Sequence, residues 1–288
     1  MSEKTALSLM LIITCSISAF GSIFIITAFL YFKSIRSFAF KLVFFMSISD
    51  LVRSISLMLP PEGLSCKFQG FLLQFSTASS ILWSFNIAYS LYTTVINQEN
   101  NPSRHQTKFL LLAYLFPFLL AFIPLFTDSY NNAVGWCWIQ KDFITDLVER
   151  IFCLYIIIWT VIAFNLSVYW KIIMKIRKEF KNVIEDQADN NAVIKRLSLY
   201  PLTLILCYLP ITVKRTMEIG GQEILPFWFL CLSAFGISIF GFANALVYGF
   251  SRPVREAIKE LFVKDFRSQS AFSLYTQKFA GSFATNNL

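Results

Sequence analysis

The chain has 288 residues, 56% of them hydrophobic and only 15% charged, and it carries a formal net charge of +8. A soluble domain would carry about 25% charged residues, so the composition excludes an ordinary soluble protein and indicates that much of the chain lies in lipid. Most Lys and Arg residues fall on one side of the expected membrane, so the positive charge reflects membrane topology and not nucleic-acid binding.

The charged residues leave seven long apolar stretches, each close to the roughly 20 residues that a helix needs to cross the hydrocarbon core. Transmembrane β-strands would instead be segments of ~10 residues with alternating hydrophobicity, which these continuous blocks do not match. We therefore predict an all-α membrane protein, a seven-transmembrane-helix bundle. The expected spans are residues 6–32, 39–59, 67–96, 109–126, 151–176, 196–216 and 226–250.

The first stretch, Thr5–Phe32, could also be read as a cleavable signal peptide. The apolar core of a signal peptide has about 7–15 residues, which is far shorter, so we favour a membrane span. The positive-inside rule then predicts an outer N-terminus, a cytoplasmic C-terminus and a multi-pass protein of the plasma membrane.

Asp50 is the only acidic residue within the expected spans, and Arg53 follows three residues later. An ionisable group inside a membrane is costly and by default indicates function. One interpretation is a polar hub that rearranges between inactive and active states, with or without a bound sodium ion. The alternative is a static pair with Arg53 at i+3 that only neutralises Asp50.

Six cysteines are present, and four of them lie within apolar blocks, where a free Cys usually acts as a small hydrophobe. Only Cys66 and Cys137 reach the expected outer face, where disulfides persist. Pairing also requires Cα atoms within about 7 Å, a condition that the sequence alone does not establish.

The sixth span contains Pro201, preceded by Tyr200, and Pro210, which follows Tyr208 by two residues. Proline weakens or kinks a helix, and a kinked helix can act as a lever that moves its cytoplasmic end. The alternative is that these residues reflect only the general frequency of proline in membrane helices.

Asn244 and Tyr248 in the seventh span are four residues apart and share one helical face. Both need polar partners inside the bundle, and Asp50 is a natural one. The alternative is a seam of small residues that packs against a neighbouring helix, formed by Gly241, Ala245 and Gly249.

The end of the chain is expected to form a short amphipathic helix at 253–262 on the inner leaflet, followed by a flexible cytoplasmic tail at 263–288. Apolar residues recur there at helical spacing opposite charged ones. Residues 1–262 would thus form one seven-helix domain.

Taken together, these motifs resemble the cyclic-AMP-receptor-like group (class E) of G-protein-coupled receptors. The resemblance covers the second through the seventh span. The matching segments are Ser49-Asp50, Cys66 with Gln69, Ser79 through Trp83, Trp136 through Ile139, Arg196 through Pro201, Cys207 through Pro210, and Gly241 through Gly249.

The chain differs from the rhodopsin-like group of the same superfamily. Where that group has Asp-Arg-Tyr, this chain has Ser90-Leu91-Tyr92, and where it has Asn-Pro-x-x-Tyr, this chain has Asn244 followed by alanine. Tyr208 stands where tryptophan is common. The resemblance implies a disulfide between Cys66 and Cys137, which would join the third helix to the second outer loop.

The resemblance also implies an extracellular small-molecule ligand, cyclic AMP or another anion, and hence outward-facing cations and stacking aromatics. However, acidic residues outnumber basic ones on the expected outer face, and lone basic residues there commonly anchor the membrane interface. The candidate ligand-binding residues are Lys67, Gln69, Trp136, Trp138, Lys141, Arg150, Lys214 and Arg215.

The implied cytoplasmic partner is a heterotrimeric G protein, whose helix would enter a crevice at the inner end of the bundle. The alternative is that the basic residues there only set topology. Receptor kinases or arrestin-like proteins could bind the Ser- and Thr-containing tail after phosphorylation. The candidate G-protein contacts are Lys171, Lys175, Arg177, Lys178, Lys195 and Arg196.

No enzyme site, cofactor or metal site is expected, because His105 is the only histidine and zinc sites need several His, Cys or carboxylate ligands. The G protein and the surrounding membrane lipid are expected partners. No nucleic-acid partner is expected. The alternative function is a seven-helix transporter or channel-like protein, although the internal repeats typical of transporters are not seen.

Overall fold

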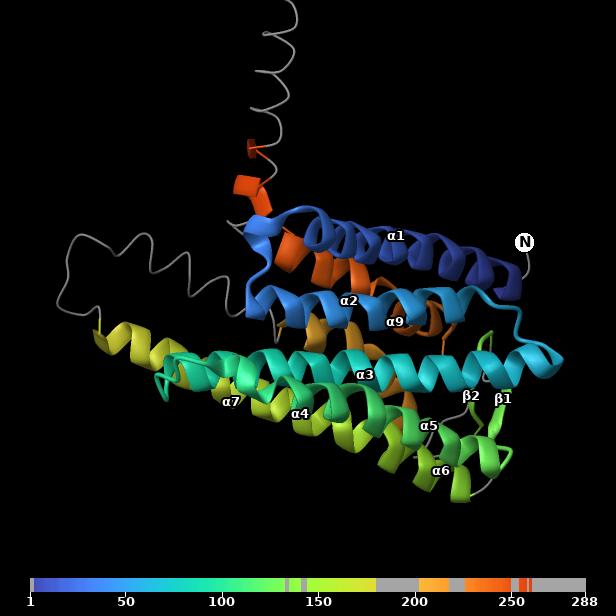
Figure 1. The fold of residues 1–288 in the computed structure, drawn as a ribbon. Helices are drawn as coiled ribbons and strands as arrows, with labels where there is room; N and C mark the ends of the chain where they lie inside the picture. The colour runs from blue at the N-terminus through green and yellow to red at the C-terminus, as the bar shows by residue number, and fades with distance from the viewer. Residues whose placement is uncertain are drawn as a thin grey trace, which may run out of the picture.

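The computed structural model describes residues 3–132, 135–140, 144–179, 202–217, 226–249, 254–257 and 259–260. These residues form a bundle of long helices with a small β-hairpin at one end (Figure 1). The N-terminus lies at this same end (Figure 1). We refer to it as the hairpin end and to the other as the opposite end.

The first three long helices and the 3₁₀ turn after the first are α1 (Glu3–Tyr31), η1 (Lys33–Ile35), α2 (Phe38–Met58) and α3 (Gly63–Val95). Ser37 caps α2, because its hydroxyl accepts a hydrogen bond from the backbone N–H of Phe40 at 3.3 Å. Such a cap satisfies an N–H group that has no partner within the helix, which fixes where α2 begins.

Two later helices each contain a π-helical turn. The first follows a 3₁₀ turn (Pro102–His105) and consists of α4 (Gln106–Leu110), the π-turn Leu111–Leu115 and α5 (Phe116–Phe126). The second consists of α6 (Ile144–Arg150), the π-turn Ile151–Tyr155 and α7 (Ile156–Glu179). Single π-helical turns within α-helices are frequent at functional sites.

The hairpin lies between these two helices in the sequence. Strands β1 (Tyr130–Asn132) and β2 (Cys137–Ile139) pair antiparallel, with Asn132 opposite Cys137. The remaining described elements are a helix at residues 202–217, α9 (Phe227–Gly249) and helical residues at 254–257 and 259–260.

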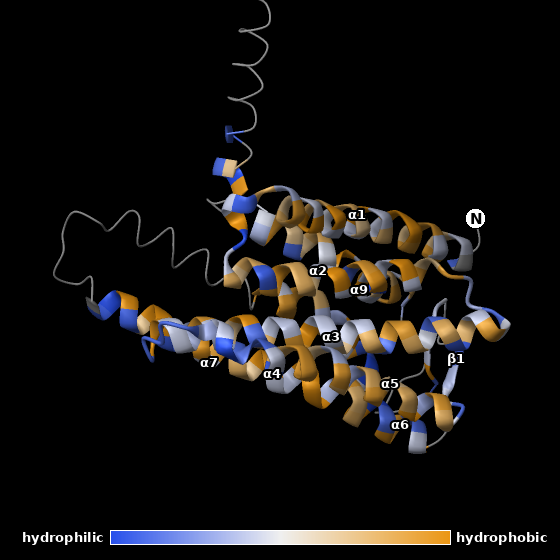
Figure 2. Ribbon diagram, in the orientation of Figure 1, coloured by the Kyte–Doolittle hydropathy of each residue, from blue (hydrophilic) through white to orange (hydrophobic). Residues whose placement is uncertain are grey.

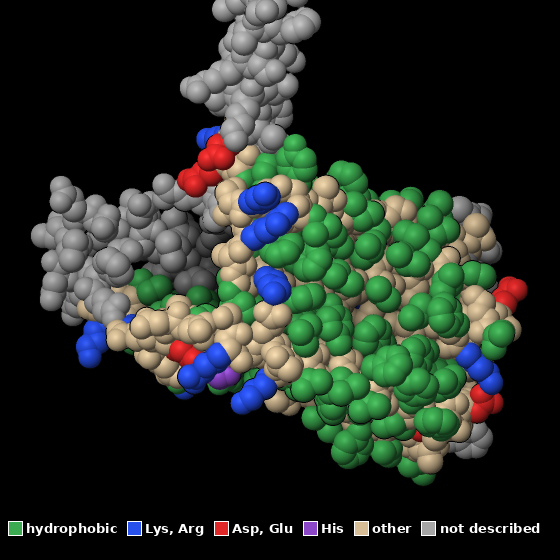
Figure 3. Space-filling model, viewed as in Figure 1, with side chains coloured by type: hydrophobic (Ala, Val, Ile, Leu, Met, Phe, Trp, Pro, Cys, Tyr) green, Lys and Arg blue, Asp and Glu red, His purple; other side chains and the backbone are tan. Residues whose placement is uncertain are grey.

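The surface of the bundle is that of a membrane protein. Apolar residues run along the helices, and hydrophobic side chains cover the middle of the visible face, with Lys and Arg gathered toward the opposite end (Figures 2 and 3). Four helical segments are long and apolar enough to cross a membrane by length and composition, namely Thr5–Tyr31, Pro102–Phe126, Ile144–Lys178 and Phe227–Gly249. The chain is therefore a helical membrane-bundle protein.

Helices α2 and α3 are more polar because they lie against several other helices. α2 packs against α1, α3 and α9, and α3 packs against α2, α5, α7 and the hairpin. Much of their polar content is buried, including Asp50, Arg53, Gln69, Gln74 and Ser80. These two helices place hydrogen-bonding groups in the interior of the bundle, where such groups must find partners within the protein.

Glycines allow close contact at two positions near the site. A Cβ atom on Gly241 of α9 would lie 2.5 Å from the Ser18 hydroxyl oxygen and 3.0 Å from the Cβ of Asp50. A Cβ atom on Gly70 of α3 would lie 2.6 Å from the Tyr130 ring. The first glycine brings α9 against α1 and α2, and the second lets the hairpin lie on α3.

Several helix limits differ from the expected spans. α3 begins at Gly63 and not at residue 67, and α6 begins at Ile144 and not at 151. The expected fifth span begins after Arg150, but Asp146, Glu149 and Arg150 are buried within a helix that continues past them. Residues 253, 258 and 261–262 of the expected amphipathic helix, and the tail at 263–288, lie outside the described residues.

Candidate functional site

A disulfide joins Cys66 of α3 to Cys137 of β2, with the two Cα atoms 5.2 Å apart. The pairing implied by the resemblance is therefore confirmed. It links positions 71 residues apart in the chain, and it fixes the hairpin to the first turn of α3. The hairpin consequently forms a cover over the helices at this end.

Gln69 holds the same junction one turn further along α3. Its side-chain carbonyl accepts the backbone N–H of Cys137 at 2.7 Å, and its amide donates to the carbonyls of Ser56 and Leu59 at 3.0 and 2.9 Å. Gln69 is also a candidate ligand-binding residue, and that role stays a prediction. Its buried amide joins α3, the end of α2 and the hairpin, because residue i+3 lies on the same helical face as Cys66.

Gln74, which the sequence analysis did not single out, fixes the tryptophan of β2. The indole N–H of Trp138 donates to the Gln74 carbonyl at 2.8 Å, and the Gln74 amide donates to the carbonyl of Cys153 at 2.8 Å. Cys153 lies in the π-helical turn before α7. The signal available in the sequence was an uncharged polar side chain inside a membrane span, which requires a partner there.

Two arginines contact the ring of Trp138. The guanidinium carbon atoms of Arg150 and Arg215 lie 5.5 and 5.3 Å from the centroid of the ring, within the range of cation–π attraction. Arg150 also donates from its Nε to the backbone carbonyl of Ile139 at 2.9 Å. Arg150 thus stabilises the hairpin, whereas Arg215 comes from the helix at residues 202–217.

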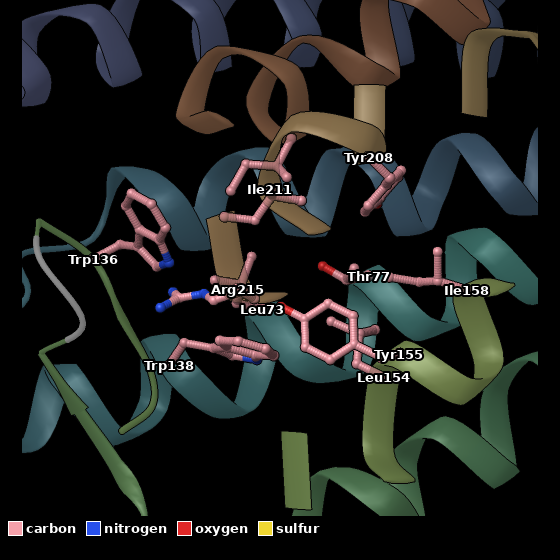
Figure 4. Close-up of a pocket in the computed structure, with 11 residues that line it drawn as sticks. Leu73, Thr77, Trp136, Trp138, Leu154, Tyr155, Ile158, Tyr208, Ile211 and Arg215 are labelled. Atoms are coloured by element: carbon pink, nitrogen blue, oxygen red, sulfur yellow. The ribbon is translucent and has the colours of Figure 1, made fainter. Parts of the chain in front are cut away.

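A cavity lies beneath the hairpin, between α3, α7, α9 and the helix at 202–217 (Figure 4). Its volume is about 40 Å³, which is far below the roughly 300–1,000 Å³ of pockets that hold drug-sized ligands. In this conformation it can hold only a very small molecule. The lining residues are Leu73, Thr77, Trp136, Trp138, Leu154, Tyr155, Ile158, Tyr208, Ile211, Arg215 and Ile237.

The other candidate ligand residues lie elsewhere. The Lys67 side chain is 44% exposed and forms an ion pair of 2.5 Å with Asp128, and Lys214 is buried but does not line the cavity. Lys141 is outside the described residues. The structure therefore brings Trp136, Trp138 and Arg215 together at the cavity.

Tyr130 of β1 holds the hairpin against the helices α3 and α5. Its hydroxyl donates to the carbonyl of Ala121 at 2.9 Å, and its ring lies on α3 at Gly70. Burial raises the pKa of the Tyr130 phenol, and the nearby Cys153 and Glu149 add to this effect. The phenol therefore remains protonated and can keep donating its hydrogen bond.

A second group of polar residues lies deeper in the bundle around Asp50. One carboxylate oxygen of Asp50 pairs with Arg53 at 3.0 Å and accepts the Ser80 hydroxyl at 2.6 Å, and the other accepts the Asn244 amide at 2.8 Å. Asp50 and Arg53 are 1% and 0% exposed, so this is a buried ion pair within a larger network. We call these four residues, together with Tyr208, the polar cluster.

Tyr208 connects the polar cluster to the cavity. Its hydroxyl accepts a hydrogen bond from Nη1 of Arg53 at 3.2 Å, and its side chain lines the cavity (Figure 4). The guanidinium carbon of Arg53 also lies 5.0 Å from the centroid of the Phe240 ring in α9. The guanidinium therefore contacts residues of α2, α9 and the helix at 202–217.

The opposite end contains a larger cavity of about 420 Å³. Tyr248 of α9 lines it, together with residues from α2, α3 and α7, and among the described residues that line it none is charged. Tyr248 is thus well separated from the cavity beneath the hairpin. Pro210 lies within the helix at 202–217, whereas Tyr200 and Pro201 are outside the described residues.

Two of the basic residues expected at the inner end make contacts within the bundle. The ammonium group of Lys175 donates to the carbonyl of Val95, the last residue of α3, at 2.6 Å. The ammonium nitrogen of Lys171 lies 5.4 Å from the centroid of the Tyr92 ring. Arg177 and Lys178 are exposed. The last two candidates, Lys195 and Arg196, are outside the described residues.

Comparison with known proteins agrees with this architecture. A family model described as slime mold cyclic AMP receptor matches residues 1–280. The chain is 30% identical over 255 residues to G-protein coupled receptor 1 of Arabidopsis thaliana, a match that covers 85% of this chain and 78% of that protein. It is 28% identical to cyclic AMP receptor-like protein A of Dictyostelium discoideum, over 85% of this chain and 64% of that protein. It is 24% identical to G-protein coupled receptor 157 of Mus musculus, over 82% of this chain and 79% of that protein.

Proposed function

Because the chain belongs to the slime mold cyclic AMP receptor family, we propose that it is a plasma-membrane receptor that activates a heterotrimeric G protein. In this proposal seven helical segments cross the membrane, with the hairpin end outside the cell and the opposite end in the cytoplasm. A small extracellular molecule binds beneath the hairpin, and its binding changes the position of the helix at residues 202–217.

The observation that carries the proposal is the double role of Tyr208. Its side chain lines the cavity, and its hydroxyl accepts the hydrogen bond from Arg53. A ligand that displaces Tyr208 would remove one partner of a buried guanidinium, and burying a charge without its partner is costly. Ligand binding and the arrangement of the polar cluster are therefore coupled through this side chain.

The disulfide supports the assignment of the hairpin end to the outside. Disulfides persist in oxidising surroundings and are rare in the cytosol, and the one between Cys66 and Cys137 lies at this end. The position of the N-terminus at the same end (Figure 1) agrees with the topology that the positive-inside rule predicts.

The cavity at the opposite end suits the G-protein contact. It has a volume of about 420 Å³, and the described residues that line it, from α2, α3, α7 and α9, are uncharged. An amphipathic helix binds its apolar face into such a groove, and the exposed Arg177 and Lys178 lie in the last turn of α7. In the proposed active state, outward movement of the helix at 202–217 would widen this groove.

The test is reconstitution of the purified chain in lipid nanodiscs with a heterotrimeric G protein. We expect the chain to accelerate guanine-nucleotide exchange on Gα above the rate with empty nanodiscs. A heat-unfolded sample of the same preparation serves as the control. Movement of a solute across reconstituted vesicles, with no acceleration of exchange by any Gα class, would support the transporter alternative and contradict the proposal.

A further inference from the structure

Gln74 of α3 joins the hairpin to the π-helical turn that precedes α7. Its side-chain carbonyl accepts the indole N–H of Trp138 in β2 at 2.8 Å, and its side-chain amide donates to the backbone carbonyl of Cys153 at 2.8 Å. Gln74, Cys153 and Trp138 are 0%, 1% and 5% exposed. At such burial water does not replace a lost partner, so a polar group that loses its bond here carries a high cost.

The turn that contains Cys153 has the wide backbone pattern of a π-helix. The N–H of Ile156 bonds to the carbonyl of Ile151, five residues earlier and not four. One extra residue changes by about 100° the direction of the side chains before the turn relative to those after it. Arg150, the last residue before the turn, donates to the carbonyl of Ile139 in β2 at 2.9 Å. The contact between the hairpin and α6 therefore depends on the form of this turn.

The two hydrogen bonds of Gln74 depend on each other, because both are made by one planar amide group. If the Trp138 indole leaves its place, the Gln74 carbonyl is unpaired in the interior of the bundle. It regains a partner only by rotating, and this rotation turns the amide N–H away from Cys153. Conversely, a change in the turn that displaces the Cys153 carbonyl draws the same group away from Trp138.

We propose that Gln74 is a positioning residue that couples the placement of the Trp138 indole to the form of the π-helical turn before α7. The inference rests on the proposed receptor function for its role in signalling. Trp138 lines the cavity beneath the hairpin, so a ligand that shifts the indole changes the turn through Gln74. This route to α7 is separate from the one through Tyr208 and Arg53.

The native thiol of Cys153 reports on the turn, because Cys153 lies within it and forms no disulfide. The purified full-length chain in nanodiscs is treated with N-ethylmaleimide, which enters the bilayer, and mass spectrometry gives the rate of modification at each cysteine. Trp138→Phe keeps a ring in place and removes the indole N–H. The rate at Cys153 should rise about three- to tenfold, the effect of one lost buried hydrogen bond. The rate at Cys15, a buried thiol of α1, should stay unchanged.

Gln74→Met tests whether the effect passes through Gln74. Methionine has a similar length and volume but makes neither hydrogen bond. This variant should raise the rate at Cys153 by itself, and adding Trp138→Phe should raise it no further. The matched control is Trp136→Phe, which removes the N–H of the other buried indole beside β2 and should leave the rate at Cys153 at the wild-type value.

An unchanged rate at Cys153 in Trp138→Phe would overturn the inference, and this measurement remains decisive if Gln74→Met does not fold. An equal rise at Cys15 would also overturn it, because the whole bundle would then have loosened. A further rise on adding Trp138→Phe to Gln74→Met would assign the coupling to Arg150, which also contacts the ring of Trp138, and not to Gln74.

Guanine-nucleotide exchange on Gα, measured in the same nanodiscs, separates this result from failure of the receptor function. Coupling at Cys153 through Gln74 with no exchange by any Gα class would contradict the proposed function and leave the link between the hairpin and the turn standing. Exchange above the rate with empty nanodiscs, without coupling at Cys153, would contradict the role of Gln74 alone.

Discussion

Tyr208 and Arg53 are joined by a hydrogen bond of 3.2 Å between the phenolic oxygen and Nη1 of the guanidinium. The bond connects the helix at residues 202–217 with α2 at a depth where both side chains are almost fully buried. Since Tyr208 also lines the cavity beneath the hairpin, this pair connects the proposed ligand site directly with the Asp50–Arg53 ion pair.

Removing the hydroxyl alone should shift the receptor toward its active state. In Tyr208→Phe the ring still fills its place, but the helix at 202–217 loses its hydrogen bond to Arg53. We expect ligand-independent signalling to rise several-fold, because a bond specific to the inactive arrangement is gone. Basal second-messenger production at matched surface expression measures this.

Tyr114→Phe is the matched control for that variant. It removes another hydroxyl of the bundle, one that donates to the carbonyl of Phe45 at 2.8 Å and does not contact Arg53. Basal signalling should stay at the wild-type level. An equal rise in both variants would mean that any lost hydroxyl loosens the bundle and that Tyr208 has no special role.

The buried pair of Asp50 and Arg53 should show strong coupling in a double-mutant cycle. Asp50→Asn leaves a buried guanidinium without its carboxylate, a change that typically costs about 3–5 kcal/mol. The double variant Asp50→Asn with Arg53→Leu carries no charge there and should be less destabilised than the sum of the single variants. Thermal unfolding in detergent gives the loss of stability for each single variant, Asp50→Asn and Arg53→Leu, and for the double variant.

The exposed pair of Lys67 and Asp128 serves as the reference cycle. Its side chains are 44% and 73% exposed, and exposed pairs contribute about 0–1 kcal/mol. A coupling between Asp50 and Arg53 no larger than this reference would contradict the account of the polar cluster.

Replacing Cys66 with alanine should reduce both ligand response and surface delivery. The disulfide holds the hairpin on α3, and loss of a native disulfide typically costs about 2–4 kcal/mol. Surface labelling and dose–response curves measure the two effects. Cys231→Ala removes a cysteine that forms no disulfide and should change neither, and survival of both properties in Cys66→Ala would refute the role of the hairpin as a fixed cover.

Pro210→Ala should alter signalling more than surface expression. Proline lacks the N–H that would bond to the preceding turn, so alanine restores a backbone hydrogen bond and stiffens the helix at 202–217. A stiffer helix should move less readily, which lowers the maximal response. Equal losses of expression and of signalling would indicate that Pro210 is only structural.

The sequence predicted the features that depend on composition and on single polar residues. Long apolar stretches indicated membrane helices, and Asp50 stood out because a lone acidic residue in such a stretch needs partners. The hydrogen bond from Asn244 to Asp50 agrees with the helical face predicted for Asn244. The disulfide followed from the expected sidedness and from the family resemblance.

What the sequence did not provide was the direction of side chains between helices that are distant along the chain. Nothing in the sequence around Gln69 indicates that its side chain bonds to α2 and to the hairpin, as the structure shows. The sequence likewise does not indicate that Gln74 accepts the hydrogen bond of the Trp138 indole. The predicted span begins after Arg150 because charged residues are usually exposed, yet its bond to the carbonyl of Ile139 and its contact with the ring of Trp138 allow Arg150 to be buried.

Movement of the helix at 202–217 can be measured directly by the distance between spin labels at Leu202→Cys and Asn97→Cys, both exposed positions. The account predicts one short distance in the ligand-free receptor, and a longer distance both on addition of nucleotide-free G protein and, in part, in the Tyr208→Phe variant alone. A single distance distribution that neither the G protein nor the loss of the Tyr208 hydroxyl changes would contradict the proposed coupling between the cavity and the cytoplasmic end.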